Sequence, residues 1–472
     1  MSTTRHHEGP PVGAPTVVTA VVVAHEGARW LPALRAAVQG QTRPPDLVVA
    51  ADTGSTDDTP RLLADWLGAG RVATCPAASG FGDAVRSALD VGHGLDVAPD
   101  WVWLLHDDCV PDADALEQLL AEVARDESVA VAGPKLRATQ ADRNLLLEVG
   151  VTIARGGRRE TMLERREQDQ GQHDGVHRVL AVSTAGMLVR RDVWDELGGL
   201  DPALPLLRDD VDLGWRANLA GHRVVCVTAA VVHHAEAATH RRRPVRAGGH
   251  RLHRLDRQHA LYVLLANLPL LRLPVALVSL TVATLLRVLG YLAAKLPRHA
   301  ADELAALVAV LGRPDRLLRA RLRRRRTRKV PARTAVRLLA PRSAGTRHLM
   351  ETVALVAGSS SGESGAGRHR GSPARGTPAP STGPTSEEDE NLPSWSTSLL
   401  RRLLLRPSVG LGLALVVLAL LAGRGLLGDG RLMGGALLPA PGSPADLWRS
   451  YVSAWHPVGV GSDAVAPPYV AV

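Results

Sequence analysis

The first half of the chain alternates short apolar runs with amphipathic stretches at regular spacing. Apolar runs rich in β-branched residues predict buried strands at 16–24, 46–51, 71–74, 101–105 and 128–133. The stretches between them predict helices at 29–39, 57–67, 80–91 and 112–126. Strand–helix alternation at this spacing predicts an α/β fold with a mostly parallel, doubly wound sheet over residues 16–240. In such sheets ligands bind beyond the carboxyl ends of the strands.

The pattern changes beyond residue 240. Residues 241–260 are basic, and 261–294 is long and apolar but interrupted by Pro269, Pro274 and charged side chains. A spanning helix needs about 20 predominantly apolar residues, and basic flanks on both sides disfavour a single crossing. We therefore expect 241–296 to be a juxtamembrane and membrane-embedded segment with both ends cytoplasmic, built as a span, a re-entrant hairpin or an interfacial helix.

The last third of the chain predicts a series of further regions. We expect a basic, helical cytoplasmic region at 297–356 and a disordered linker rich in Gly, Ser, Pro and Thr at 357–406. Residues 407–427 are apolar apart from Arg424 and predict a transmembrane helix. The segment 428–472 is then extracytoplasmic, and its aromatic residues suit the membrane interface. It reads as the start of a larger region of a longer protein.

Composition narrows the protein class. The chain has 472 residues, of which 45% are hydrophobic, enough to bury the cores of several units. Its three cysteines lie far apart without a CxxC pair, which argues against a disulfide framework and against a cysteine-based zinc site. Residues 1–15 are polar, predict disorder and lack the apolar region of a secretory signal. The chain is therefore expected to begin in the cytoplasm.

The net charge of +9 comes almost entirely from arginine. A basic chain can bind nucleic acid, an anionic membrane or anionic substrates. The densest arginine run, 313–347, lies between two apolar segments, and this placement favours membrane lipids as its partner. We expect no nucleic-acid partner.

Two glycine-containing turns follow predicted strands. Asp52 ends one strand and is followed by Gly54 and Ser55, so its carboxylate can accept hydrogen bonds from a base or a ribose. The alternative is ordinary strand–turn–helix capping. Gly80 and Gly82 open the next helix, where the backbone can approach a diphosphate or simply form a flexible loop.

Adjacent carboxylates end the strand at 101–105, in the sequence His106-Asp107-Asp108. Because neighbouring negative charges repel, a cation is expected beside them. A divalent metal bridging diphosphate oxygens is the natural candidate, since Mg²⁺ is often bound by one or two carboxylates plus phosphates. A solvated turn before the next helix is the alternative.

A third group of polar residues lies near residues 209–234. Asp209, Asp210 and Asp212 open a predicted helix, where the helix dipole favours acidic residues and where an aspartate can also act as a general base. The strand that follows ends in His233 and His234, which are either metal ligands or polar residues at a rim.

In this order, the clusters resemble family 2 glycosyltransferases with the GT-A fold, in the galactofuranosyl- and rhamnosyltransferase-like branch. The resemblance rests on the opening strand up to His25, Gln41-Thr42, the turn from Asp52 to Asp57, His106-Asp107-Asp108, Gly186 to Arg191, Gly198 to Asp201, Asp209 to Leu213, and the histidine after the last strand. It covers about residues 16–240, half of the chain.

The resemblance implies a role for each matching residue. Asp52, His106 and Asp107 would bind the nucleotide sugar, Asp108 and His234 would hold a divalent cation (Mg²⁺ or Mn²⁺), and Asp210 would be the catalytic base. Gly186, Asp209, Trp215 and Arg216 would lie on the acceptor side. One position departs from the family pattern, because His106 stands where many members have the first aspartate of the metal motif.

The implied activity is inverting transfer of a sugar from a nucleotide-diphosphate sugar to a lipid-linked or cell-envelope glycan acceptor. The enzyme would work at the plasma membrane with its catalytic domain in the cytoplasm. Two alternatives stay open. A GT-A-like nucleotidyltransferase would carry a Gly-rich, basic loop after the first strand, and residues 25–29 fit that poorly. A non-catalytic glycan-binding or scaffolding membrane protein with a degenerate domain is the other.

Overall fold

The computed structural model describes residues 16–95, 98–139, 144–161, 163–164, 166–236, 252–293 and 296–340. All of them lie in the first of two units into which the chain divides, Met1–Thr397. The predictions for residues 1–15, the basic residues 241–250, the linker 357–406, the transmembrane helix 407–427 and the tail 428–472 therefore lie outside the described residues.

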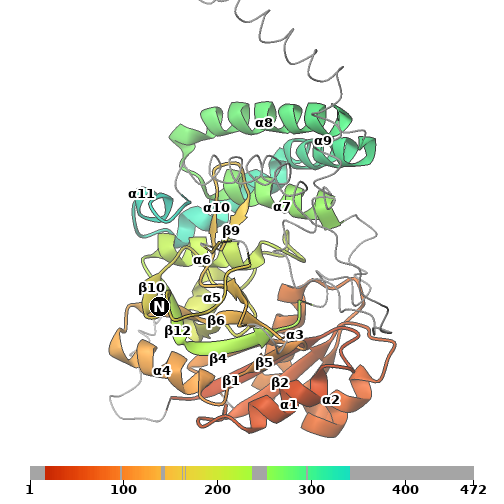
Figure 1. The fold of residues 1–472 in the computed structure, drawn as a ribbon, viewed down its shortest axis with the longest axis vertical. Helices are drawn as coiled ribbons and strands as arrows, with labels where there is room; N and C mark the ends of the chain where they lie inside the picture. Colours follow the sequence, from red (N-terminus) through yellow and green to blue (C-terminus); the bar gives the residue numbers. More distant parts are fainter. Residues whose placement is uncertain are drawn as a thin grey trace, which may run out of the picture. The chain divides into compact units, whose positions relative to one another are not determined.

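The predicted α/β sheet is confirmed. Its strand order is β10-β12-β6-β11-β4-β1-β2-β3, and β1 is parallel to both β2 and β4 (Figure 1). β11 runs antiparallel between β4 and β6, whereas β12 is parallel to β6. The strands are β1 Val18–Ala24, β2 Leu47–Asp52, β3 Val72–Thr74, β4 Trp101–His106, β5 Cys109–Pro111, β6 Val129–Ala138, β7 Leu146–Glu148, β8 Thr152–Ile153, β9 Arg159–Glu160, β10 Val176–Arg178, β11 Leu188–Arg190 and β12 Arg223–His234.

Helices cover both faces of this sheet, which explains why its strands are apolar without alternation. In β1, Val21 packs into the cluster that includes residues of α3, and Val22 packs into the cluster that includes residues of α1, α2 and α4. The helices of this part are α1 Leu31–Gln39, α2 Thr59–Leu67, α3 Phe81–His93, α4 Ala115–Arg125, α5 Arg191–Leu197 and α6 Asp209–Ala220. The sequence periods predicted α1 to α4 to within a few residues, and the acidic residues at 209–212 predicted the start of α6, whereas α5 was not predicted.

A further group of helices packs on α6. It consists of α7 Leu252–Asn267, the 3₁₀ turn Leu270–Arg272, α8 Leu273–Ala293, α9 Pro297–Leu311, α10 Pro314–Thr327 and α11 Arg333–Val336. Leu261, Val263 and Leu264 of α7 are buried in one apolar cluster with Trp215 of α6. The prediction that 261–294 is membrane-embedded as a whole is therefore wrong for α7, because its apolar side chains fill the protein interior.

The part of that segment open to solvent begins after Pro269. Residues Leu270–Leu292 form a stretch of 23 residues whose most apolar part has a mean hydropathy of 1.9, long and apolar enough by length and composition to cross a membrane. One face of α8 packs on the protein through Leu280 and Thr284. The other face carries exposed large aliphatic side chains, namely Val275, Val278, Val282, Leu285, Leu286, Leu289 and Leu292.

The arginine run also divides between interior and surface. Arg324 of α10 is buried, and its guanidinium donates hydrogen bonds to Asp201 at 2.9 Å and to Asp212 of α6 at 2.6 Å. Arg321 donates hydrogen bonds to the backbone carbonyl oxygens of Leu265 and Leu268, and these bonds cap the end of α7. The prediction that this run serves a membrane surface is thus wrong for these two arginines, which hold α10 against its neighbours.

Candidate active site

Three parallel strands end side by side at one edge of the sheet. Ala24 of β1 lies opposite Asp52 of β2, and Val23 lies opposite His106 of β4. The buried Asp52 carboxylate accepts the backbone N–H of Ser55 through Oδ2 at 3.2 Å, and its Oδ1 has no hydrogen-bond partner among the described residues. A buried acceptor without a partner is costly, so this oxygen is available to a donor group of a ligand.

Asp107 turns toward the backbone after β1. Its Oδ2 accepts the N–H of His25 at 2.9 Å. A Cβ at Gly27 would stand 2.4 Å from the same oxygen, so this close approach requires glycine. Asp107 therefore ties the end of β4 to the turn after β1, and its binding of a nucleotide sugar stays a prediction.

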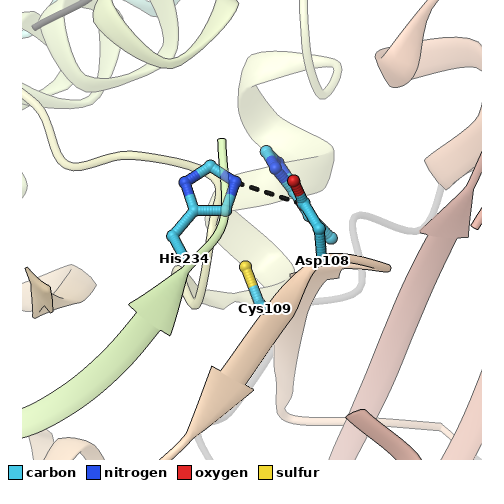
Figure 2. A group of neighbouring side chains, drawn as sticks. Asp108, Cys109 and His234 are labelled. Carbon is cyan, nitrogen blue, oxygen red and sulfur yellow. Dashed lines mark hydrogen bonds and ion pairs between the residues drawn. The ribbon is translucent and has the colours of Figure 1, made fainter. Parts of the chain in front are cut away.

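Four potential metal ligands meet beyond β4. The ligand atoms of His106, Asp108, Cys109 and His234 all lie within 4.8 Å of one another. His234 Nε2 lies 3.2 Å from Asp108 Oδ1, and Figure 2 shows both side chains beside the Cys109 sulfur. His106 Nε2 also lies 2.9 Å from the Thr184 hydroxyl, and its ring meets the His234 ring edge to face.

The electrostatics of this cluster favour a positive charge. Burial disfavours the imidazolium of His234, but the carboxylate of Asp108, together with those of Glu236 and Glu148, outweighs burial and raises the pKa of His234 to about 9. The same carboxylate would stabilise a divalent cation at this position. Imidazole and carboxylate groups are ordinary ligands of divalent transition metals, so the residues present fit such an ion.

The predicted base lies at the start of α6. Asp210 Oδ2 accepts a hydrogen bond from the Arg159 guanidinium at 2.7 Å, and Asp210 Oδ1 accepts one from the backbone N–H of Val211 at 2.7 Å. Asp209 beside it is also buried, and burial together with the charge of Asp210 raises the pKa of Asp209 to about 7. The two adjacent aspartates thus have different environments, because the Asp210 carboxylate is paired with the Arg159 guanidinium.

Arg159 and Glu148 connect the predicted base to the candidate cation cluster. Arg159 donates to Glu148 at 2.8 Å while it holds Asp210. Glu148 lies close enough to His234 for its negative charge to contribute to the raised pKa of that ring. A chain of charged groups therefore runs from the cation-attracting cluster to the candidate base.

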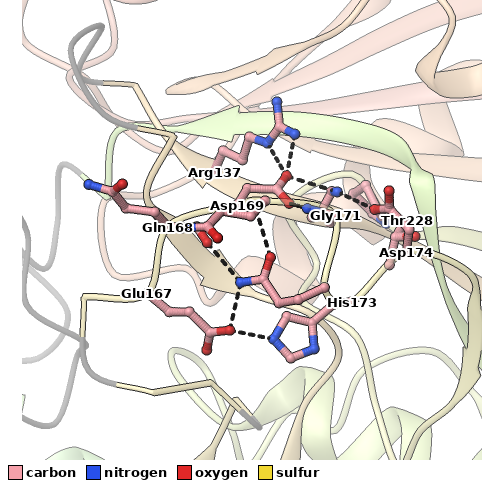
Figure 3. Close-up of polar contacts among 12 residues, drawn as sticks. Arg137, Glu167, Gln168, Asp169, Gly171, His173, Asp174 and Thr228 are labelled. Carbon is pink, nitrogen blue, oxygen red and sulfur yellow. Dashed lines mark hydrogen bonds and ion pairs between the residues drawn. The ribbon is translucent and has the colours of Figure 1, made fainter.

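Both residues of this link come from the segment between β6 and β10. Figure 3 shows how the end of this segment is fixed. The Asp169 carboxylate accepts hydrogen bonds from the Arg137 guanidinium of β6 and from the backbone N–H of Gly171. Lys135 donates to Asp169 at 2.8 Å and to Asp174 at 2.9 Å. Burial of Asp169 is outweighed by these cations, which lower its pKa to about 2. The ion pairs of the buried Asp169 hold the segment that carries Arg159 against the sheet.

The remaining residues predicted on the acceptor side have internal contacts. Trp215 is 0% exposed, and Arg216 donates to Asp212 at 2.7 Å and to the carbonyl oxygen of Gly199 at 2.9 Å. Gly186 has φ +96°, and a Cβ there would come within 2.8 Å of Pro134. These contacts position α6 and the turn before β11, and a role toward an acceptor stays a prediction.

Comparison with known proteins gives the family. The model described as "Glycosyltransferase like family 2" matches residues 14–247. Residues 14–247 belong to glycosyltransferase family 2. The α/β sheet described above is accordingly a GT-A glycosyltransferase fold, and the chain is a family 2 glycosyltransferase.

Two curated relatives cover most of this glycosyltransferase domain. An N-acetylglucosaminyl-diphospho-decaprenol L-rhamnosyltransferase of Mycobacterium tuberculosis is 27% identical over 249 residues, 48% of this chain and 78% of the relative. The galactofuranosyltransferase GlfT1 of Mycolicibacterium smegmatis is 28% identical over 224 residues, 46% of this chain and 70% of the relative. A mannosyltransferase of Pyrobaculum calidifontis, solved with GDP-mannose and Mn²⁺, superposes with TM-score 0.36 at 18% identity, covering 73% of this chain and 91% of that one.

The structure adds three residues to the candidate site that the sequence did not indicate. Glu148 and Arg159 lie in short strands far from any predicted motif, and nothing in their spacing points to Asp210. Cys109 follows Asp108 directly, so the sequence alone places it next to the predicted metal ligand. A lone cysteine without a CxxC partner gave no reason to group it with His234, which is 125 positions further along the chain.

Proposed function

We propose that this glycosyltransferase inverts the configuration of the sugar it transfers, from a nucleotide-diphosphate sugar to a lipid-linked or cell-envelope glycan acceptor. The observation that carries the proposal is the arrangement of Asp210. It lies apart from the cluster of His106, Asp108 and His234 but is linked to it through Arg159 and Glu148. One site can thus hold the leaving diphosphate while a separate carboxylate meets the acceptor.

The donor would bind at the carboxyl edge of the sheet. Asp52 has a buried acceptor oxygen for a base or ribose donor group, and His106, Asp108 and His234 would hold a divalent cation, Mg²⁺ or Mn²⁺. A bound divalent cation neutralises the charge that develops on a leaving diphosphate.

Asp210 would act as the general base. As the acceptor hydroxyl attacks the anomeric carbon from the face opposite the diphosphate, Asp210 Oδ accepts the hydroxyl proton, and the nucleoside diphosphate leaves. Arg159 keeps the Asp210 side chain fixed during this step, since the guanidinium is itself held by Glu148. The reaction needs no covalent enzyme intermediate.

The lipid-linked acceptor is supported by the relatives and by α8. The name of the rhamnosyltransferase states a decaprenol-linked acceptor. In this chain the 3₁₀ turn before α8 and α8 itself expose apolar side chains, with Leu271 of the turn 95% and Val275 of α8 72% exposed. We propose that this face lies in the interface of the plasma membrane, with the catalytic domain on the cytoplasmic side, where membrane lipids and a lipid-linked acceptor meet the enzyme.

A panel of sugar nucleotides tests the activity. The full chain is incubated with each donor, Mg²⁺ or Mn²⁺, and a polyprenyl-diphosphate sugar acceptor, and both transfer and hydrolysis are read. The stereochemistry of the product, determined by NMR, tests inversion, and a retained configuration contradicts the proposed mechanism. Absence of transfer and hydrolysis with every donor favours the non-catalytic alternative.

The cytoplasmic location is tested separately by cysteine accessibility in intact cells. A Ser343→Cys variant should react with a membrane-impermeant maleimide only after the cells are permeabilised. Labelling of this position from outside would place the arginine-rich region on the wrong side.

A further inference from the structure

Cys109 enters the cation cluster through strand pairing. β5 and β12 are antiparallel, and Cys109 lies directly opposite His234. Residues directly opposite each other in an antiparallel pair project to the same face, with their Cβ atoms about 5 Å apart. Figure 2 shows the result, with the Cys109 sulfur pointing into the space between His234 and Asp108. The thiol is therefore placed by the sheet register.

The four side chains form a mixed set of nitrogen, oxygen and sulfur ligands. His106 and His234 offer imidazole nitrogens, Asp108 a carboxylate oxygen and Cys109 a thiol, all within 4.8 Å of one another. Mg²⁺ prefers octahedral oxygen ligands and keeps several waters. Zn²⁺ is bound by cysteine, histidine and carboxylate side chains in a compact tetrahedral site, and soft sulfur ligands select transition metals over Mg²⁺.

The surroundings of the thiol favour such a centre. Cys109 is fully buried and packs in an apolar cluster with Leu136, Ala185 and Val232. This wall shields one side of the cluster from water, where a metal–sulfur bond is protected from exchange. The competing explanation is that Cys109 only fills space as a small apolar residue, and the two explanations predict different metal binding.

We propose that Cys109 is a ligand of the cation site, so that this chain binds Zn²⁺ and Co²⁺ through sulfur and more tightly than it binds Mg²⁺. On binding, the Cys109 thiol and the imidazolium of His234 each release one proton to solvent, and the Sγ–metal and imidazole–metal bonds form. The proposal rests on the proposed function only in using the same cluster as the cation site of the glycosyl transfer.

Cobalt substitution tests the proposal without any assay of turnover. The full-length chain is titrated with Co²⁺, and the near-ultraviolet spectrum is read for the sulfur-to-cobalt charge-transfer band that arises only when a thiolate binds the metal. We expect the band in the wild type, its loss in Cys109→Ala and Cys109→Ser, and its retention in Cys75→Ala, in which a buried thiol outside the cluster is removed. A wild type without the band, or a Cys109→Ala variant that keeps it, overturns the proposal.

Affinity gives a second readout. Zn²⁺ affinity, measured by competition with a chromophoric chelator, should fall at least about tenfold in Cys109→Ser, since loss of even an outer-sphere partner costs that much at metal sites. Mg²⁺ affinity should stay unchanged. Equal Zn²⁺ affinity in the wild type and in a folded Cys109→Ser variant, with folding checked by circular dichroism, contradicts the assignment.

The two proposals fail separately. A cobalt band together with no transfer from any sugar nucleotide keeps the sulfur ligand and removes the proposed glycosyl transfer. Transfer that proceeds with Mg²⁺ or Mn²⁺, from a protein without a cobalt band, keeps the enzyme and removes Cys109 from the site.

Discussion

Asp108 is the carboxylate of the cation cluster, and it shares the site with two imidazoles. Asp108→Ala should therefore abolish turnover that depends on divalent cations, whereas His234→Ala should weaken cation dependence less, because other ligands and diphosphate oxygens remain. Initial rates against Mg²⁺ and Mn²⁺ concentration measure both effects. Asp65→Ala, which removes an exposed carboxylate of α2, is the matched control. Undiminished turnover in Asp108→Ala would remove the cation from this position.

The choice of base depends on two adjacent residues. Asp210→Asn keeps the size of the side chain and can still accept a hydrogen bond from Arg159, but it cannot take a proton, so kcat should fall about 10²–10⁴-fold. Asp209→Asn should lose much less. Steady-state kinetics of both variants at saturating donor decide between them. If Asp209→Asn is inactive and Asp210→Asn is near wild type, the base is Asp209, and activity in both refutes the mechanism.

Asp209 also makes stability depend on pH. Burial and the neighbouring Asp210 raise the pKa of Asp209 from 3.8 to about 7 in the folded protein. The folded state therefore holds this proton more tightly than the unfolded state, so the stability linked to it is full below pH 4 and is lost as the pH rises to about 7. A shift of that size corresponds to at most about 4 kcal/mol.

Asp209→Asn removes this penalty because the amide does not ionise. The melting temperature of the variant relative to the wild type should rise between pH 4 and pH 7 and reach a plateau above pH 7. Thermal unfolding of both proteins across this range gives the difference directly. A difference that is constant with pH would show that Asp209 does not carry the shifted proton.

Among the elements, α10 has a role that its composition conceals. Its arginine run is typical of a solvated or membrane-facing helix, yet Arg324 is buried against Asp201 and Asp212. Burial of Asp212 is outweighed by Arg324 and Arg216, which together lower its pKa. Helix α6, whose second residue is the candidate base, is thus held by a helix more than a hundred positions later in the chain.

Removing Arg324 leaves two buried carboxylates without this cation. Arg324→Met should destabilise the protein by about 3–5 kcal/mol, the usual cost of breaking a buried ion pair by removing one partner. Arg325→Met, at an exposed neighbouring position of α10, should change stability little. Urea unfolding of both variants measures the difference. Equal stability of the two variants would mean that Arg324 does not support α6 in solution.

The strands and helices of the sheet could be predicted because their apolar periods are local. The start of α6 and the strand end at His106 were also visible, since acidic residues at such positions stand out in the sequence. The contacts that complete the site are not local. Arg159 reaches Asp210 across 51 positions, and Arg324 reaches Asp212 across 112. Ion pairs over such separations leave no period in the sequence. The apolar packing of α7 on α6 is not local either, so α7 could be mistaken for a membrane segment.

In the unit as a whole, the helices after the sheet divide into buried and open faces. α7 is buried, whereas α8 and α9 expose aliphatic side chains that include Leu304, Val308 and Leu311. α8 is also fixed to the protein, because its Arg287 donates to the buried Glu303 of α9 at 2.9 Å. A helix that keeps these contacts along one face lies along a bilayer surface more readily than across it. Exposed arginines nearby, such as Arg272, add attraction to anionic lipid headgroups.

Vesicle flotation tests this arrangement with the chain shortened to residues 1–397, which omits the predicted span at 407–427. The shortened chain should float with vesicles containing phosphatidylglycerol, because burial of the open face of α8 in the lipid adds to the attraction of arginine for anionic headgroups. A variant with Val278, Leu285 and Leu289 each replaced by glutamate should stay in the dense fraction. Val176→Glu, on an exposed strand of the catalytic sheet, should float like the wild type. Flotation of the triple variant would refute the proposal that the open face of α8 lies in the membrane interface. A wild type that stays dense but forms dimers, which the triple variant loses, would assign the face to a second copy of the chain.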